Sequence, residues 1–211
     1  TLHPKLGNFL KLASQKKNFF DIKMNTNGTR LTEKLCHEIL SSRLNEIVFS
    51  IDSEIKNVYE SIRVNAKFEE VVKNIEMFQS IRCKEYPGNK IHSRISGVFF
   101  ENTQNADSFV EFWKDKVDSV GYVNCENRWD TYNNTPDQKK DPCTYLWERM
   151  YVWFDGKCNP CDVDYKSKLS PGNLQNLSIE EAWNSELYQT LRQNHLSGKR
   201  DSHDPCDRCG V

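Results

Sequence analysis

The sequence has no long apolar run, no excess charge of either sign and no amino-terminal stretch typical of a secretory signal. No segment approaches the roughly 18 consecutive apolar residues of a membrane span. Residues 1–17 lack an uninterrupted apolar stretch and end in a basic patch. A formal net charge of −1, with Lys and Arg mixed among Asp and Glu, gives no general attraction to nucleic acid. We therefore expect a cytoplasmic globular protein that binds neither membranes nor nucleic acid.

The cysteines, by contrast, are numerous. The chain has 211 residues, of which 37% are hydrophobic and 28% charged, enough for one large or two small domains. Eight cysteines without an export signal indicate reduced thiols or metal ligands in preference to disulfides. Three are scattered singly, and five fall in the last third of the chain, namely Cys143, Cys158, Cys161, Cys206 and Cys209.

The first part of the chain alternates between two hydrophobic patterns. Apolar, β-prone runs predict strands at residues 19–26, 45–52, 90–100 and 118–125. Helical spacing predicts helices at 31–42, from 54, at 68–81 and at 107–116, with Thr32 as the first amino-terminal cap. Such alternation is typical of βα units with a parallel sheet, so we expect an α/β fold.

After Cys125 the pattern changes. A polar stretch with two prolines indicates a linker or long loop, so we expect one domain at residues 1–130 and a second at 131–211. The second part has a hairpin signal at Asp155-Gly156 and a capping box from Ser178 to Glu181. It has few apolar residues in regular elements, and cysteine-bound metal would supply the missing stability.

Two C-x2-C pairs could hold that metal. Cys158 with Cys161, and Cys206 with Cys209, together form a possible four-thiolate site. Zinc knuckles usually have their pairs about 15 to 20 residues apart, whereas residues 162–205 lie between these pairs and include a predicted helix. A non-catalytic binding module stabilised by zinc on four cysteines therefore remains one hypothesis.

Another pairing points to a family. Residues 143–209 resemble the SPASM or twitch domain of radical S-adenosylmethionine (radical SAM) enzymes, whose motif is a cysteine, a spacer, Gly-x4-Cys and a distal Cys-x2-Cys. Gly156 and Cys161 match the Gly-x4-Cys. Cys158 lies where the family more often has an apolar strand residue, so we interpret it as a buried thiol, with a ligand role as the alternative. The resemblance implies one auxiliary [4Fe-4S] cluster on Cys143, Cys161, Cys206 and Cys209.

The resemblance continues upstream. Residues 24–31 resemble the third strand of the radical SAM barrel with its Thr-Asn-Gly turn, and residues 48–52 the fourth strand with its Ser-x-Asp ending. It implies an incomplete (β/α)6 partial TIM-type barrel followed by a small cysteine-rich SPASM/twitch domain. No three cysteines have the CxxxCxxC spacing of the catalytic cluster. We therefore expect the carboxy-terminal fragment of a longer enzyme, cut after its second strand.

In the intact family, S-adenosylmethionine and a second [4Fe-4S] cluster generate a 5′-deoxyadenosyl radical that abstracts a substrate hydrogen. The resemblance implies that the full-length protein is an oxidoreductase or maturase of this kind. Its substrate would be a small molecule or a peptide, and its electron donor a flavodoxin or ferredoxin. This chain alone would carry only the auxiliary cluster, so whether it is itself an enzyme is left open.

Several polar residues follow or interrupt the predicted strands. Ser50 matches a cofactor-binding position of the family; the alternative is a strand-end hydroxyl bonded to backbone. Arg63 could bind the cofactor's carboxylate or be a solvated helix-end arginine. Arg94 points toward substrate in the barrel or to the surface. Asp52 is expected to cap the helix that follows it.

Arg128 and Trp129 follow the last predicted strand, where loops at the top of such barrels carry chemistry. We expect them to line the substrate site. His203 lies close to the last cysteine pair and is the one histidine that we consider as an alternative ligand.

Overall fold

The computed structural model describes residues 3–100, 104–125 and 127–211. Its contacts divide the chain into two compact units, Thr1–Cys125 and Glu126–Val211. Residue 130, the expected boundary, lies inside the 3-10 helix η1 (Asn127–Asn133) of the second unit. Among the described residues, no helix combines the length and apolar character needed to cross a membrane.

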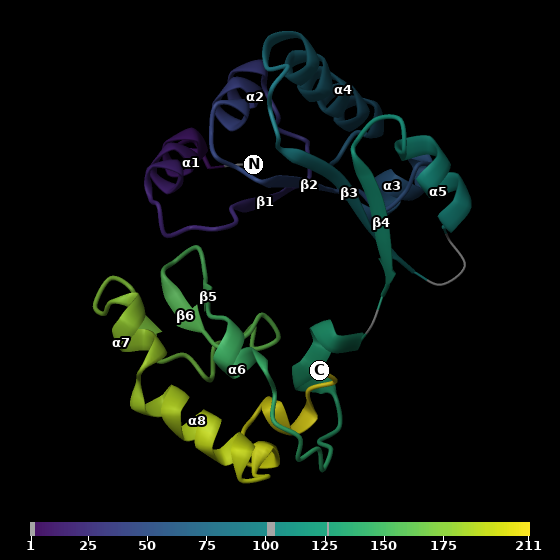
Figure 1. Cartoon of the computed structure of the whole chain (residues 1–211). Helices are drawn as coiled ribbons and strands as arrows, with labels where there is room; N and C mark the ends of the chain where they lie inside the picture. The colour runs from purple at the N-terminus through teal and green to yellow at the C-terminus, as the bar shows by residue number, and fades with distance from the viewer. Residues whose placement is uncertain (1–2, 101–103, 126) are drawn as a thin grey trace. The chain divides into compact units, whose positions relative to one another are not determined.

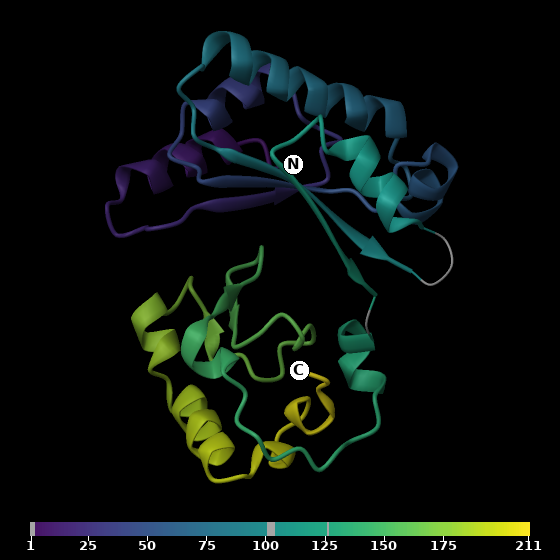
Figure 2. The same ribbon diagram turned by 45° about the vertical axis from the view of Figure 1, so that its right-hand side comes forward.

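A four-stranded, fully parallel sheet organises the first unit, with the strand order β1-β2-β3-β4. Helices connect successive strands and cover one face of the sheet (Figures 1 and 2). The strands are β1 (Lys23–Thr26), β2 (Glu46–Ser50), β3 (His92–Phe99) and β4 (Ser119–Asn124), and the helices are α1 (Leu6–Gln15), α2 (Glu33–Leu40), α3 (Lys56–Ile62), α4 (Phe68–Glu85) and α5 (Ala106–Trp113). The expected α/β class is confirmed.

Alternation along the strands assigns side chains to two faces. Ile47, Phe49 and Ile95 are fully buried in the core that includes the helices. Because strand side chains alternate, Ser50 and Arg94 lie on the opposite face, which the helices leave uncovered. Parallel registry places Ser50 of β2 beside Ser96 of β3 on that face.

Two local expectations had different outcomes. Thr32 caps α2 as predicted, since its hydroxyl accepts a hydrogen bond from the Leu35 amide. The first strand, however, begins only at Lys23, and Phe20 is 96% exposed. The apolar run that precedes β1 favours a strand, but β1 pairs only with β2, so this part of the edge has no second partner. Helix α1 was not predicted.

Gly97 of β3 permits a close approach of the Ile51 backbone and the Phe109 ring to the strand. An added methyl group there would lie 2.9 Å from the Ile51 carbonyl oxygen and 3.0 Å from Phe109 Cζ. We expect Gly97→Ala to lower the free energy of unfolding by about 1–3 kcal/mol, because overpacking forces backbone and ring to shift. Chemical denaturation measures this. Gly88→Ala is the control, since a methyl group added at Gly88 would meet nothing within 4 Å, and an equal loss in both variants would contradict the argument.

The second unit is built around a small antiparallel sheet in the order β5-β6-β7. The Asp155-Gly156 hairpin is confirmed, with Gly156 at φ +86°. The capping box is also confirmed, since Ser178 and Glu181 each bond the other's backbone amide. The elements are α6 (Tyr145–Glu148), β5 (Tyr151–Val152), β6 (Lys157–Asn159), β7 (Gly172–Asn173), α7 (Ile179–Trp183), α8 (Glu186–Leu196), η2 (Arg200–Ser202) and η3 (Cys206–Arg208).

The aliphatic core of the second unit is small. Its main cluster of buried residues is Leu146, Leu169, Tyr188 and Leu191. Strand β7 has only two residues, and both pair with β6. So few apolar contacts leave much of the unit's stability to other interactions.

Candidate metal centre

Four cysteines of the second unit line one apolar cavity. They are Cys143, Cys161, Cys206 and Cys209, the four that the sequence resemblance had assigned as ligands. The remaining wall is mostly apolar and includes Leu146, Val163 and Leu169. The structure thus brings together sulfurs that lie up to 66 positions apart in the sequence (209 − 143).

Short elements hold these cysteines in place. Cys143 closely precedes helix α6, and Cys161 follows β6 after Pro160. Cys206 begins η3, and Cys209 directly follows it. Cys158 belongs to β6, where it pairs with Gly172 and Val152, and it is fully buried but absent from the cavity wall.

A buried carboxylate organises the loop after Cys161. Asp164 is fully buried and accepts backbone amides from Lys168 at 3.0 Å and Leu169 at 2.8 Å. The Tyr132 hydroxyl also donates to it. Burial and this hydrogen bond raise the pKa of Tyr132 far above its ordinary value. Sequence reasoning missed Asp164, because nothing in the sequence distinguishes it from neighbouring Asp162.

Two further buried polar residues lie close to the cysteines. His195 of α8 is fully buried, and its Nδ1 accepts the Cys143 amide at 3.2 Å. Burial, helped by Arg200 and His203, lowers the pKa of His195 to about 4, so the ring is neutral at neutral pH. Nothing in the sequence indicated a partner for it. His203, the alternative ligand, pairs with Asn194 at 2.9 Å and does not line the cavity.

Burial controls the protonation of the cavity thiols. It raises the pKa of Cys161 to about 12, although backbone hydrogen bonds from Asp164 and Val163 oppose the shift. Burial also raises the pKa of Cys143 and of Cys206. Without metal these three thiols are therefore protonated at neutral pH, and a bound metal would have to displace the protons.

The donor set fits a metal centre with thiolate ligands. Four thiolates are the usual ligands of both zinc and [4Fe-4S] clusters. Cys143, Cys161, Cys206 and Cys209, which line one cavity, would hold such a group.

The first unit places the proposed cofactor residues at the carboxyl ends of its strands. Ser50 is the last residue of β2. Arg63 directly follows α3 and donates from Nε to Asp52 Oδ2 at 2.5 Å. It also lines a pocket of about 650 Å3 with Asn27, next to the end of β1. Arg63 is therefore neither free nor simply solvated, since it forms an ion pair with a carboxylate whose side chain is only 3% exposed.

The expectation for Asp52 was wrong. Helix α3 begins after Ile55 and has no side-chain cap, whereas Asp52 accepts the Val98 amide at 3.0 Å in addition to Arg63. The reason is geometric: three residues separate Asp52 from the helix, and its carboxylate turns into the sheet to satisfy a strand-end amide. It thereby ties β2, α3 and β3 together.

The predicted substrate residues lie in both units. Arg94 of β3 is exposed on the face without helices, and its guanidinium lies over Gly121 of β4, where an added methyl group would be 2.6 Å from Nη2. Arg128 and Trp129 lie in η1 of the second unit, and their side chains are outside the described residues. The three predicted substrate residues therefore belong to different units.

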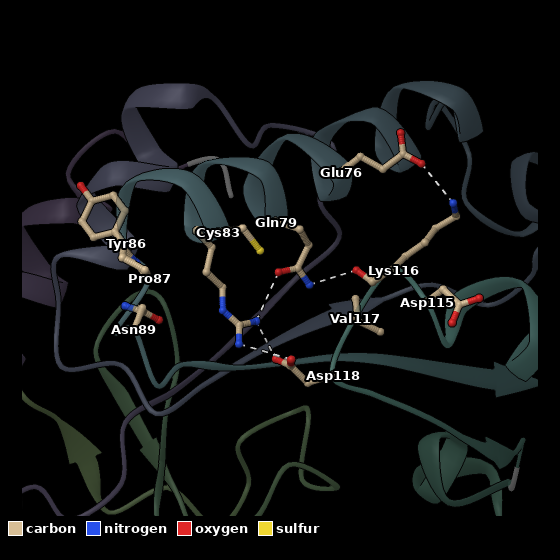
Figure 3. Close-up of a pocket in the computed structure, with 11 residues that line it drawn as sticks. Glu76, Gln79, Cys83, Tyr86, Pro87, Asn89, Asp115, Lys116, Val117 and Asp118 are labelled. Carbon is tan, nitrogen blue, oxygen red and sulfur yellow. Dashed lines mark hydrogen bonds and ion pairs between the residues drawn. The ribbon is translucent and has the colours of Figure 1, made fainter.

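The first unit has another pocket, of about 620 Å3, near the amino ends of β3 and β4 (Figure 3). Its polar side chains bond mainly to one another. Lys116 pairs with Glu76 at 3.1 Å, Gln79 donates to the Lys116 carbonyl at 2.9 Å, and Arg82 pairs with Asp118 at 2.6 Å. In α/β barrels, chemistry lies at the opposite, carboxyl ends of the strands. We therefore interpret this pocket as structural.

The interactions of Asp118 in that pocket should make the free energy of unfolding depend on pH. Burial opposes its ionisation, but bonds from Arg82 and Ser93 prevail and hold its pKa at about 2, below the ordinary 3.8. A lowered pKa stabilises the fold above pH 4, and this stabilisation is lost as pH falls toward 2. We expect a loss of about 1 kcal/mol, because the partly exposed pair is screened. Denaturation at pH 5 and pH 2.5 measures it; Asp118→Asn should remove this part of the slope, and an unchanged slope would contradict it.

Comparison with protein families identifies the second unit. Residues 143–210 match the family described as SPASM, iron-sulfur cluster-binding domain. This match covers the four cavity cysteines and the elements that hold them. No curated protein matches the sequence significantly.

Solved structures share the fold of the whole chain. Streptococcus suis SuiB bound to precursor peptide SuiA is 12% identical with a TM-score of 0.66, covering 89% of this chain and 52% of that one. The anSMEcpe structure with AdoMet and Kp18Cys peptide is 16% identical with a TM-score of 0.62, covering 97% and 70%. BtrN in complex with AdoMet and 2-DOIA is 18% identical with a TM-score of 0.56, covering 99% and 67%.

These findings define the class of protein. The chain has the fold of a radical SAM enzyme with a SPASM domain, in which part of a radical SAM barrel precedes the cysteine-rich unit. Residues 143–210, less than half of the chain, match the SPASM iron-sulfur cluster-binding domain. The chain spans about half the length of the SuiB chain that it matches.

Proposed function

We propose that this chain is part of a radical SAM/SPASM oxidoreductase or maturase, and that its second unit binds one auxiliary [4Fe-4S] cluster. The observation that carries the proposal is the shared cavity of Cys143, Cys161, Cys206 and Cys209. Four thiolates leave no open iron, so the cluster would serve electron transfer or stabilisation. A single cluster is expected, because residues 162–205 contain no further cysteine.

The first unit would contribute to the cofactor site of the whole protein. S-adenosylmethionine supplies the hydrogen-abstracting 5′-deoxyadenosyl radical when bound with a catalytic cluster. Ser50 at the end of β2 and Arg63 beside the 650 Å3 pocket would bind it. The Asp52–Arg63 ion pair holds the guanidinium at the carboxyl end of the sheet, where it could meet a carboxylate.

The substrate would be a peptide or a small molecule. SuiB binds a precursor peptide and BtrN binds 2-DOIA, so relatives of this fold accept both. Arg94 lies on the sheet face without helices, which in a closed barrel would face the lumen. Arg128 and Trp129 are proposed to line the same substrate site. A flavodoxin or ferredoxin would be the electron donor.

Anaerobic reconstitution with iron and sulfide tests the proposal. We expect about four irons and four sulfides per chain, with a broad absorbance band near 400 nm, the order expected for one cubane. A colourless protein that takes up one zinc tightly and no iron would overturn the proposal. It would favour the zinc-stabilised binding module instead.

A further inference from the structure

Arg200 is a buried cation in the wall of the cysteine cavity. It follows helix α8 as the first residue of η2 and is only 2% exposed. It lines the cavity together with Cys143, Cys161, Cys206 and Cys209. Arginine is almost never fully buried unless it is paired, so the burial of Arg200 calls for a physical reason.

No carboxylate side chain among the described residues forms an ion pair with Arg200. Its Nη1 donates to the Asp141 carbonyl at 3.3 Å, and its Nη2 donates to the Cys209 carbonyl at 3.4 Å and to a main-chain oxygen of Val211, the last residue of the sequence, at 2.5 Å. Its Nε is buried without any partner. Main-chain oxygens therefore accept from both Nη atoms, whereas Nε has no acceptor.

A buried donor without an acceptor is costly. The sulfurs of protonated thiols are only weak acceptors for the Arg200 Nε. A [4Fe-4S] cluster held by four thiolates, in contrast, has a net negative charge in both of its common redox states. Because Arg200 and the four cysteines line the same cavity, a cluster bound there would place a negative charge beside the guanidinium.

We propose that Arg200 is the counter-charge of the cluster held in this cavity, and that its guanidinium raises the cluster's reduction potential. The inference rests on the proposed function. A nearby positive charge stabilises the reduced cluster more than the oxidised one, because reduction adds a negative charge, and net charge and hydrogen bonds are among the factors that set cluster potentials.

The test compares four forms of this chain after anaerobic reconstitution, with the cluster's midpoint potential and iron content as readouts. Arg200→Gln removes the charge but keeps a hydrogen-bond donor, and Arg200→Lys keeps the charge. Arg192→Gln is the matched control, since Arg192 also donates to two backbone carbonyls, at 2.8 and 2.9 Å, without lining the cavity. Wild type is the fourth form.

We expect Arg200→Gln to lower the equilibrium constant for reduction about tenfold, or about 59 mV for a one-electron couple. Arg200→Lys should stay closer to wild type, and Arg192→Gln should not shift. A wild-type midpoint potential in Arg200→Gln would overturn the inference about Arg200 but not the proposal that the chain binds a cluster. If Arg200→Gln takes up no cluster, recovery in Arg200→Lys supports the charge argument, and equal loss in Arg200→Lys overturns it. Wild type without iron would overturn the proposed function and this inference together.

Discussion

Replacing Cys161 by serine should reduce the reconstituted iron from about four per chain to nearly none, whereas the same change at Cys158 should leave it near four. The two cysteines lie three positions apart in one strand-and-turn segment. Cys161 lines the cavity, whereas Cys158 is buried within β6 of the small sheet. Because a serine is similar in size to cysteine, both variants mainly change the sulfur itself.

Iron and sulfide quantitation with an absorbance spectrum measures both variants. The pair is its own control, since each protein differs from wild type by one sulfur. Equal loss of iron in both would mean that the two C-x2-C pairs bind the metal together, as in the zinc hypothesis. Loss only in Cys158→Ser would contradict the ligand assignment from the cavity.

The sequence predicted the strands and most helices of the first unit well, because β2 and β3 each have an apolar face that helices cover. The predictions that failed concern segments whose conformation depends on a neighbouring strand. The apolar run at Phe19 and Phe20 has the composition of a strand, but β1 has a neighbour on one side only. The paired residues of β7 are a glycine and an asparagine, so no hydrophobic pattern could have indicated this strand.

In the candidate metal centre, too, some residues could be predicted from the sequence and others could not. Cysteine spacing and the family resemblance selected the four sulfurs, because metal ligands must be of a particular type. The buried polar residues near these cysteines could not be predicted from the sequence. Asp164, His195 and Arg200 act through contacts with segments up to 59 positions away, such as Arg200 with Asp141. In the sequence they look like ordinary loop or helix residues, and only burial distinguishes them.

The second large effect is expected at Asp164. Asp164→Ala should destabilise the second unit by about 3 kcal/mol or more, because it leaves two backbone amides and the Tyr132 hydroxyl without their acceptor in a buried site. Denaturation of the chain, followed by near-ultraviolet signals of the second unit, measures the loss. Asp155→Ala is the matched control, since Asp155 is exposed at the hairpin turn and its carboxylate accepts one amide, from Lys157.

The same change should weaken the metal centre without removing a ligand. Backbone hydrogen bonds from Asp164 and Val163 act on the Cys161 sulfur, so a loosened loop would disturb the position of that ligand. Asp164→Ala should therefore reconstitute fewer irons and lose them to a chelator faster than wild type, whereas Asp155→Ala should match wild type. Tyr132→Phe removes one donor and leaves both amides bonded, so its effect should lie between the two. If Asp164→Ala lost stability but kept its iron as long as wild type, the loop would be a structural element independent of the ligand that it carries.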